Sequence, residues 1–396
     1  MSKRRQNLIV VVGVVFLLLA GAWALAAVFG GSVEYDRNGK KVAIKGKAKS
    51  SVATVAVATN TEPVVTHLKT PKAVKAIYMT SWIAGSKNLR PRLIDLIDRT
   101  ELNAVVIDIK DYTGLIAFEI DNPAIKKLGS FEKRITDLPA LIAELHRKNI
   151  YVIGRISTFQ DASLAKKRPD LAVKRASDGA VWRDRKGISW LDAGSKEAWD
   201  YTVLLAKESY ALGFDELNFD YIRFPSDGNM RDIAYPFSHA TESNKPDVLA
   251  GFFKYLSSQL HPLGIPISAD LFGMVCTNYD DLGIGQVLEK AAPYFDFIAP
   301  MVYPSHYPTG YMGIKKPALS PYAVINHNMK VAAERLEKAS TTRAKLRPWL
   351  QDFDLGADYT AEMIREEKRA VYDNGLNSWM MWDPGNHYTT GAYDSI

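Results

Sequence analysis

Apolar runs alternate with amphipathic segments from Val74 to the end of the chain. Most of the apolar runs are nearly continuous, as expected for strands that are buried on both faces. The segments between them carry helix signals: Ser195 precedes the periodic segment 196–212, and Gly213 follows it. The other helices expected with such signals are 139–149 and 359–374. The expected strands are 74–80, 104–110, 151–157, 216–222, 266–272, 297–303, 346–353 and 377–383.

This alternation predicts an α/β fold, a single (β/α)8 TIM barrel over residues 73–396. Strands that alternate with helices form parallel sheets. No Gly-x-Gly-x-x-Gly follows the first strand, which argues against a dinucleotide-binding doubly wound sheet. Two long connections, 158–194 and 225–246, follow strands three and four. They leave the carboxyl ends of the strands, where active sites of TIM barrels lie.

The first 30 residues predict a cytoplasmic basic start and a transmembrane helix. Leu8–Phe29 is an apolar run about as long as a membrane span, and Lys3, Arg4 and Arg5 precede it. A signal peptide has a shorter apolar region, so an uncleaved signal anchor is favoured; cleavage after Ala24-Leu25-Ala26 is the alternative. The basic residues place the N-terminus in the cytoplasm. We therefore expect a single-pass protein of the cell membrane with an extracytoplasmic C-terminal domain.

Residues 31–72 form a basic hairpin and linker in this interpretation. Segment 32–46 alternates around Asn38-Gly39, a favoured two-residue turn, and residues 47–71 lack helical periodicity. The net charge of +6 comes from the N-terminal part, because residues 76–396 contain more acidic than basic side chains. That distribution argues against a nucleic-acid partner. The basic stretch fits contact with anionic lipid or wall polymer, or a solvated linker.

Polar side chains collect at the carboxyl ends of the expected strands. At least five carboxylates converge there, and a charge in an apolar strand is costly unless it is paired or functional. One such aspartate alone would fit a salt bridge or a cap, but five together favour a site. Period-two alternation predicts that Asn218, Asp220 and Ile222 point inward, while Phe219 and Tyr221 face the helices. The expected ligand-binding residues in this set are Asp108, Lys110, Asp111, Arg155, Arg223, Tyr303, His306, Asp352 and Asp383.

Asp220 and Asp270, on adjacent strands, are the candidate catalytic pair. Glycoside hydrolysis needs two carboxyl groups, about 5 Å apart for retention of configuration and wider for inversion. We expect Arg223 to lower the pKa of Asp220, which suits a nucleophile. We expect partial burial to raise the pKa of Asp270, which suits an acid. The sequence leaves an exchange of these two roles open.

Aromatic residues support a sugar ligand. Trp82, Trp190 and Trp382 are expected at the rim, where they would stack on sugar rings, whereas Trp379 and Trp199 are expected in the core. No metal or cofactor is predicted. The chain lacks His-Glu-x-x-His, a Gly-x-Ser-x-Gly elbow and a P-loop. Its one cysteine, Cys276, excludes an intrachain disulfide and is expected to be a buried apolar residue.

Four stretches resemble a bacterial family of glycoside hydrolase barrel domains, distantly similar to α-amylase-type barrels. They are 104–111, 213–225, 267–273 and 297–304, and the resemblance covers 73–390. It implies a polysaccharide-directed glycosidase with Asp220 as the strand-four nucleophile. The α-amylase type has a Glu acid after strand five, where this chain has Asp270. Segment 213–222 also resembles the chitinase pattern Asp-x-x-Asp-x-Asp-x-Glu, but Asn218 and Ile222 replace its middle Asp and its acid, so that mechanism is not available here.

The leading hypothesis is a membrane-anchored extracytoplasmic glycoside hydrolase that acts on a cell-wall or extracellular polysaccharide. The first alternative is a barrel of the cell envelope that binds glycan without cleaving it. A third is an envelope assembly or scaffold protein that uses the basic linker.

Overall fold

The computed structural model describes residues 65–341 and 345–396. The expected transmembrane segment, the hairpin 32–46 and most of the linker lie outside these residues. Within them, no helix is both long and apolar enough to cross a membrane.

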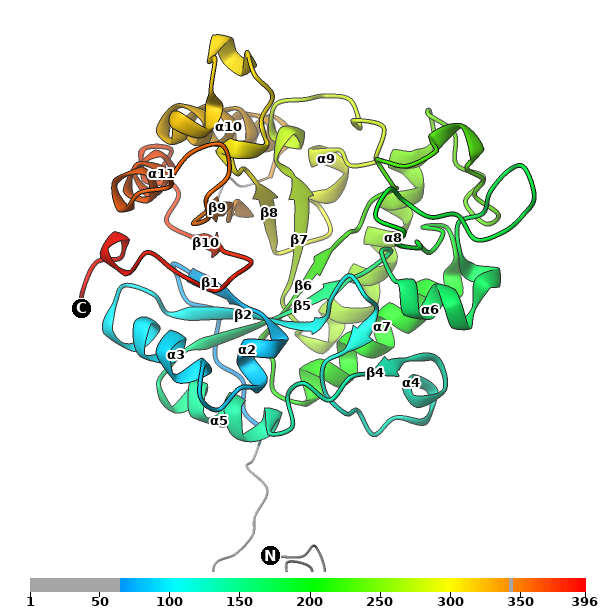
Figure 1. The fold of residues 1–396 in the computed structure, drawn as a ribbon, viewed down its shortest axis with the longest axis horizontal. Helices are drawn as coiled ribbons and strands as arrows, with labels where there is room; N and C mark the ends of the chain where they lie inside the picture. Colours follow the sequence, from blue (N-terminus) through cyan, green and yellow to red (C-terminus); the bar gives the residue numbers. More distant parts are fainter. Residues whose placement is uncertain (1–64, 342–344) are drawn as a thin grey trace, which may run out of the picture. The chain divides into compact units, whose positions relative to one another are not determined.

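The described chain forms a closed barrel of parallel strands surrounded by helices (Figure 1). Each barrel strand is parallel to its neighbours, and β1 closes the ring because Ile77 pairs with Val105 on one side and with Met381 on the other. The barrel strands are β1 (Lys75–Met79), β2 (Ala104–Lys110), β5 (Tyr151–Ser157), β6 (Glu216–Asp220), β7 (Ile267–Phe272), β8 (Phe297–Met301), β9 (Trp349–Gln351) and β10 (Trp379–Trp382). The predicted (β/α)8 barrel is therefore confirmed for the described residues.

Local signals place the helices close to where the sequence predicts them. The Ser195 hydroxyl accepts the Ala198 backbone N–H at the start of α7, and Gly213, with φ 111°, follows its end. The helices are α2 (Ser81–Gly85), α3 (Arg90–Arg99), α4 (Pro123–Leu128), α5 (Leu138–Arg147), α6 (Ala162–Lys167), α7 (Lys196–Ala211), α8 (Lys245–Leu260), α9 (Leu288–Ala291), α10 (Pro321–Lys338) and α11 (Ala361–Asp373).

Two short strands, β3 (Leu115–Ile116) and β4 (Ser130–Phe131), extend the sheet beyond β2. At the other end of the chain, the backbone N–H of Glu101 donates to the carbonyl of Asp394 at 2.7 Å. The C-terminal segment is thereby fixed beside the end of α3, as Figure 1 shows.

The core lies both inside the barrel and between the strands and the helices. Every residue of β2, β5 and β6 is buried, which explains why β2 and β5 begin as apolar runs, whereas β6 buries Glu216, Asn218 and Asp220 among its apolar residues. Trp379, Trp199 and Cys276 are buried in this core, as the sequence predicts.

Residues 65–70 contact the amino-terminal ends of the barrel strands. The backbone N–H of Leu68 donates to the Asp215 carboxylate at 2.6 Å, just before β6. The Thr70 hydroxyl lies 2.9 Å from the hydroxyl of Tyr151, the first residue of β5. The chain therefore enters the barrel at the end opposite to the carboxyl ends of the strands.

The two long loops at the carboxyl ends are ordered against each other. Lys174 and Ala234 exchange backbone hydrogen bonds of 3.0 and 2.8 Å. The carboxylate of Asp192 accepts the backbone N–H groups of Phe237 and Ser238. These contacts hold both loops as one fixed wall beside the carboxyl ends of β5 and β6.

Candidate functional site

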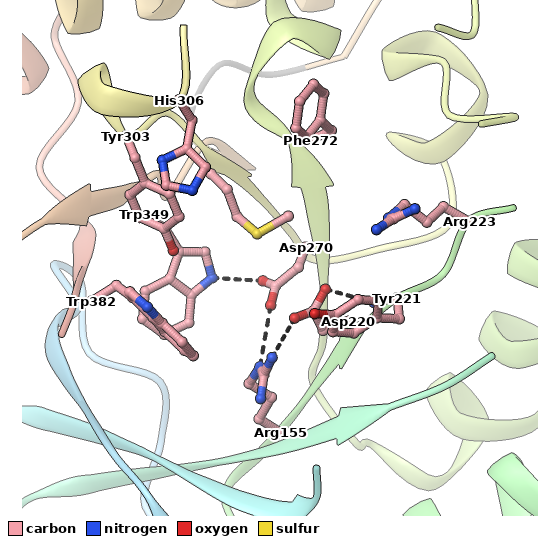
Figure 2. Close-up of a pocket in the computed structure, with 11 residues that line it drawn as sticks. Arg155, Asp220, Tyr221, Arg223, Asp270, Phe272, Tyr303, His306, Trp349 and Trp382 are labelled. Carbon is pink, nitrogen blue, oxygen red and sulfur yellow. Dashed lines mark hydrogen bonds and ion pairs between the residues drawn. The ribbon is translucent and has the colours of Figure 1, made fainter. Parts of the chain in front are cut away.

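A pocket of about 320 Å³ opens at the carboxyl ends of the strands (Figure 2). This is the end of a TIM barrel where catalytic residues collect. The lining residues are Arg155, Asp220, Tyr221, Arg223, Asp270, Phe272, Met301, Tyr303, His306, Trp349 and Trp382. Both expected catalytic aspartates are therefore in one cavity.

Asp220 is the last residue of β6 and is held by two donors. One carboxylate oxygen accepts Nη2 of Arg155 at 2.5 Å, and the other accepts the backbone N–H of Tyr221 at 2.5 Å. The strand ends here because Tyr221 adopts φ 51°, in the left-handed region that a tyrosine rarely occupies. Such strained residues often occur at functional sites.

Arg155 in β5 lies among three carboxylates. Its guanidinium donates to Asp108 at 2.7 Å and to Asp220, and its Nε is 3.9 Å from Asp270. Burial disfavours the charge, but these carboxylates hold the pKa of Arg155 well above its usual value. The ring of Trp382, 5.2 Å from the guanidinium carbon, further fixes its position. Arg155 is thus a permanent cation at the floor of the pocket.

Asp270 in β7 is almost fully buried. One carboxylate oxygen accepts Nδ2 of Asn218 at 2.8 Å and Nε1 of Trp349 at 2.7 Å. Burial and the negative charge of Asp220 raise the pKa of Asp270 to about 8, against the opposing effect of Arg155. Asp270 therefore carries a proton at neutral pH.

Asp108 in β2 lies behind Arg155 and does not line the pocket. Its carboxylate accepts the Tyr78 hydroxyl at 2.5 Å as well as the guanidinium. Burial raises its pKa despite the nearby Arg155. The Tyr78 ring stacks on Trp382, with centroids 4.0 Å apart. Asp108 and Tyr78 therefore position Arg155 and Trp382.

The structure corrects two expectations about the segment after β6. Arg223 does not pair with Asp220, because Arg155 occupies that place and Arg223 donates instead to the Phe224 carbonyl and the Ser226 hydroxyl. Tyr221 does not face the helices. Its positive φ turns the side chain into the pocket lining.

An aromatic wall borders these charges, because Trp349 donates to Asp270 and Trp382 lies beside Arg155. Trp349 and Trp382 meet edge to face with centroids 5.6 Å apart, and Tyr303 and His306 lie above them in Figure 2. Burial lowers the pKa of His306, so this ring is neutral at pH 7. Flat aromatic surfaces beside buried polar groups are typical of small-molecule sites.

Four other expected ligand-binding residues lie outside the pocket. Lys110 is fully buried and forms an ion pair with Asp161 at 2.6 Å. Asp111 accepts Arg134 at 2.5 Å. Trp82 is 58% exposed on α2, and the guanidinium of Arg134 lies 4.6 Å from its ring. Trp190 is buried at 2% exposure and lies behind Tyr221 rather than at the rim.

Asp352 and Asp383 line a neighbouring pocket at the ends of β9 and β10. Asp352 accepts the Thr389 hydroxyl and the Tyr393 hydroxyl, and burial raises its pKa. Asp383 accepts the backbone N–H groups of Gly385 and His387. These hydrogen bonds brace the C-terminal segment.

Across residues 65–341 and 345–396, no group of three or more His, Cys, Asp or Glu is placed to hold a metal ion.

Four lining residues are absent from the expected set: Tyr221, Phe272, Met301 and Trp349. Trp349 had a weak signal: it lies in the expected strand 346–353, but alternation puts it on the face opposite to that of the expected residue Asp352. Tyr221 had none, because its orientation follows from the positive φ.

Comparison with known proteins identifies a family for this domain. Residues 76–388 match the model of a family described as "Putative glycosyl hydrolase domain". The chain belongs to this family. The match spans all eight barrel strands and both long loops, so the glycosyl hydrolase domain includes the whole pocket. No curated protein matches the chain.

Several solved structures are similar to this glycosyl hydrolase domain. A hypothetical protein from Ruminiclostridium thermocellum is 36% identical over 49% of this chain and 96% of its own, with a TM-score of 0.45. The glycoside hydrolase domain of PgaB (BpsB) from Bordetella bronchiseptica is 14% identical over 81% of this chain and 97% of its own, with a TM-score of 0.59. The second likeness, at this low identity, shows the shared fold.

Proposed function

We propose that the protein is a glycoside hydrolase that cleaves a cell-wall or extracellular polysaccharide with Asp220 and Asp270. The observation that carries this proposal is the pairing of two unlike carboxyl groups in one pocket. Asp270 holds a proton near neutral pH, while Asp220 receives two hydrogen-bond donors, one of them the Arg155 cation. Environments that separate two carboxyl groups in this way identify an acid and its charged partner.

The roles follow from these surroundings. Asp270 is the general acid, which protonates the glycosidic oxygen as the bond to the leaving sugar breaks. Asp220 is the anion that faces the positive charge developing on the sugar ring; water then adds to the anomeric carbon, and its proton restores Asp270. Arg155 orients the Asp220 carboxylate. The aromatic wall of Trp349 and Trp382 supplies the stacking surface for the ring.

The family of this domain and the end at which the chain enters the barrel both fit a polymeric substrate. The structurally similar PgaB domain is itself named a glycoside hydrolase domain. We propose further that Leu8–Phe29 anchors the protein in the cell membrane with the barrel outside. Residues 65–70 reach the barrel at the end opposite to the pocket, so a tether on that side leaves the pocket free for a wall or exopolysaccharide chain.

The test is reducing-end release by the full-length protein, purified with a mild detergent, on a panel of wall and extracellular polysaccharides. We expect Asp220→Asn to abolish release while the protein stays folded, as a cooperative thermal melt would show. Asp95→Asn, on the exposed face of α3, is the matched control and keeps full activity. Equal release by Asp220→Asn and wild type would refute the assignment. Saturable glycan binding without any release would favour the non-catalytic alternative.

A further inference from the structure

Arg223 is a second cation of the pocket, and its surroundings differ from those of Arg155. It follows β6 and is partly buried at the pocket wall. Its guanidinium carbon lies 5.0 Å from the Trp190 ring and 5.4 Å from the Tyr221 ring. These two rings fix the guanidinium, since arginine stacks on aromatic faces.

No carboxylate in the described part of the chain forms an ion pair with Arg223. Its side-chain hydrogen bonds to described residues both use Nη1, which donates to the Phe224 carbonyl at 3.0 Å and the Ser226 hydroxyl at 3.2 Å. Burial lowers the pKa of Arg223, although Tyr221 and the nearby carboxylates, Asp220 before Asp227 and Asp184, favour its charge. Arg155, in contrast, contacts three carboxylates.

A partly buried cation without an ion-pair partner costs free energy in the protein without ligand. Neither carboxyl group of the pocket pairs with Arg223, because Asp220 already forms an ion pair with Arg155 and Asp270 is protonated. Among the described residues, Nε and Nη2 of Arg223 donate no hydrogen bond, so both are available to a ligand. Such a planar fork matches an oxyanion in two parallel hydrogen bonds.

We infer that Arg223 is the specificity residue of an anionic subsite, and that the substrate is an acidic glycan. This inference rests on the proposed glycosidase. In Figure 2 the two aspartates lie between Arg223 and the aromatic side chains Trp349 and Trp382. One sugar therefore stacks on the aromatic wall, and the sugar across the cleaved bond presents its anionic group to Arg223. That group is a uronic carboxylate or a sulfate ester, which share the oxyanion chemistry.

Binding is measured by calorimetry on the full-length Asp220→Asn protein, so that no cleavage occurs. The carboxylate arm uses hexasaccharides of galacturonan, alginate and hyaluronan beside their carboxyl-reduced forms. The sulfate arm uses a sulfated galactan hexasaccharide beside its desulfated form. We expect at least one acidic hexasaccharide to bind about 10- to 100-fold more tightly than its neutral form, as a charge-assisted bidentate contact implies.

The variant Arg223→Gln should abolish that preference without weakening binding of the neutral form. Arg223→Lys should keep part of it, and Arg99→Gln, an exposed arginine of α3, is the matched control that keeps all of it. Equal binding of acidic and neutral forms in both arms, or an acid preference that persists in Arg223→Gln, would overturn the inference.

The two proposals fail in different ways. An acid preference that depends on Arg223, without cleavage by the wild type, refutes the glycosidase and leaves the anionic subsite standing. Cleavage of neutral glycans with no acid preference refutes the subsite and leaves the glycosidase standing.

Discussion

The two ends of the barrel interior both bury charges, but they arrange them differently. At the amino-terminal end, Glu216 and Arg347 are fully buried and form a one-to-one ion pair. Glu216 also accepts the Ser268 hydroxyl at 2.6 Å. At the carboxyl end, Arg155 contacts three carboxyl groups, one of which is protonated, and Arg223 forms no ion pair with a carboxylate of the described residues.

This difference separates structure from chemistry. A matched buried pair satisfies both of its charges within the protein, so it has nothing left for a ligand. A set with unequal charges has its pKa values displaced, and such displacement is what acid–base catalysis requires. Burial alone does not distinguish the two ends, whereas the balance of charges does.

The largest effect is expected when the proton that Asp270 carries at neutral pH is removed. Asp270→Asn should lower kcat by about 10²- to 10⁴-fold, because a positioned general acid contributes that much. Stability at pH 7 should not fall, since the asparagine is neutral without having to keep a proton that the unfolded aspartate releases near 3.8. The measurements are reducing-end release and a thermal melt. A loss below tenfold would show that another group donates the proton.

The converse change is made at the other end. Arg347→Met leaves the Glu216 carboxylate buried without its cation and should cost about 3–5 kcal/mol of unfolding free energy. Urea unfolding measures the cost. The activity per folded molecule should stay within twofold. The double variant Glu216→Leu/Arg347→Met is the control and should recover most of the loss. A cost below about 1 kcal/mol would show that the pair is not what holds this end.

Most of the barrel could be predicted from sequence. The bounds of β2 and β5 match the expected strands, because strands buried on both faces leave continuous apolar runs. The same reasoning brought Asp220 and Asp270 together, since residues of neighbouring parallel strands meet at one end.

The directions of side chains around the rim could not be predicted in the same way. Alternation fails where a strand ends, as Tyr221 shows with its positive φ. Sequence proximity suggested Arg223 as the partner of Asp220, but the cation comes from the adjacent strand, at Arg155. Asp352 and Asp383 do lie at strand ends, yet they line the neighbouring pocket. Spacing fixes the level of a residue in the barrel but not the cavity into which it points.

The pH dependence of activity also distinguishes the two ends, because Asp270, whose pKa is raised, lies at the carboxyl end. If Asp270 is the acid, kcat/KM should fall about tenfold per pH unit above a pKa of about 8, as the proton is lost. The profile should lose this limb in Asp270→Asn. A profile flat up to pH 9.5 in the wild type would exclude Asp270 as the acid.

Stability should follow the same proton. The folded state keeps it up to about pH 8, whereas an unfolded aspartate releases it near 3.8. The unfolded state therefore binds fewer protons in this window, and the unfolding free energy should fall as the pH rises from about 4 to about 8. The contribution of one such group is at most about 1.4 kcal/mol per pH unit. Urea unfolding of wild type and Asp270→Asn in parallel isolates it, and identical slopes would contradict it.

The smallest effect is expected at a residue that belongs to neither end. Trp82 is exposed on α2 and contacts Arg134 outside the pocket, although its place after the first strand suggested a sugar platform. Trp82→Ala should change kcat/KM by less than twofold, because it removes only an exposed cation–π contact of about 0.5–1 kcal/mol. Trp382→Ala is the matched comparison, since Trp382 lines the pocket and holds Arg155. It should raise KM and lower kcat together. Equal losses in the two variants would mean that the substrate extends over α2, and the charges beneath the strand ends would then no longer mark the limits of the site.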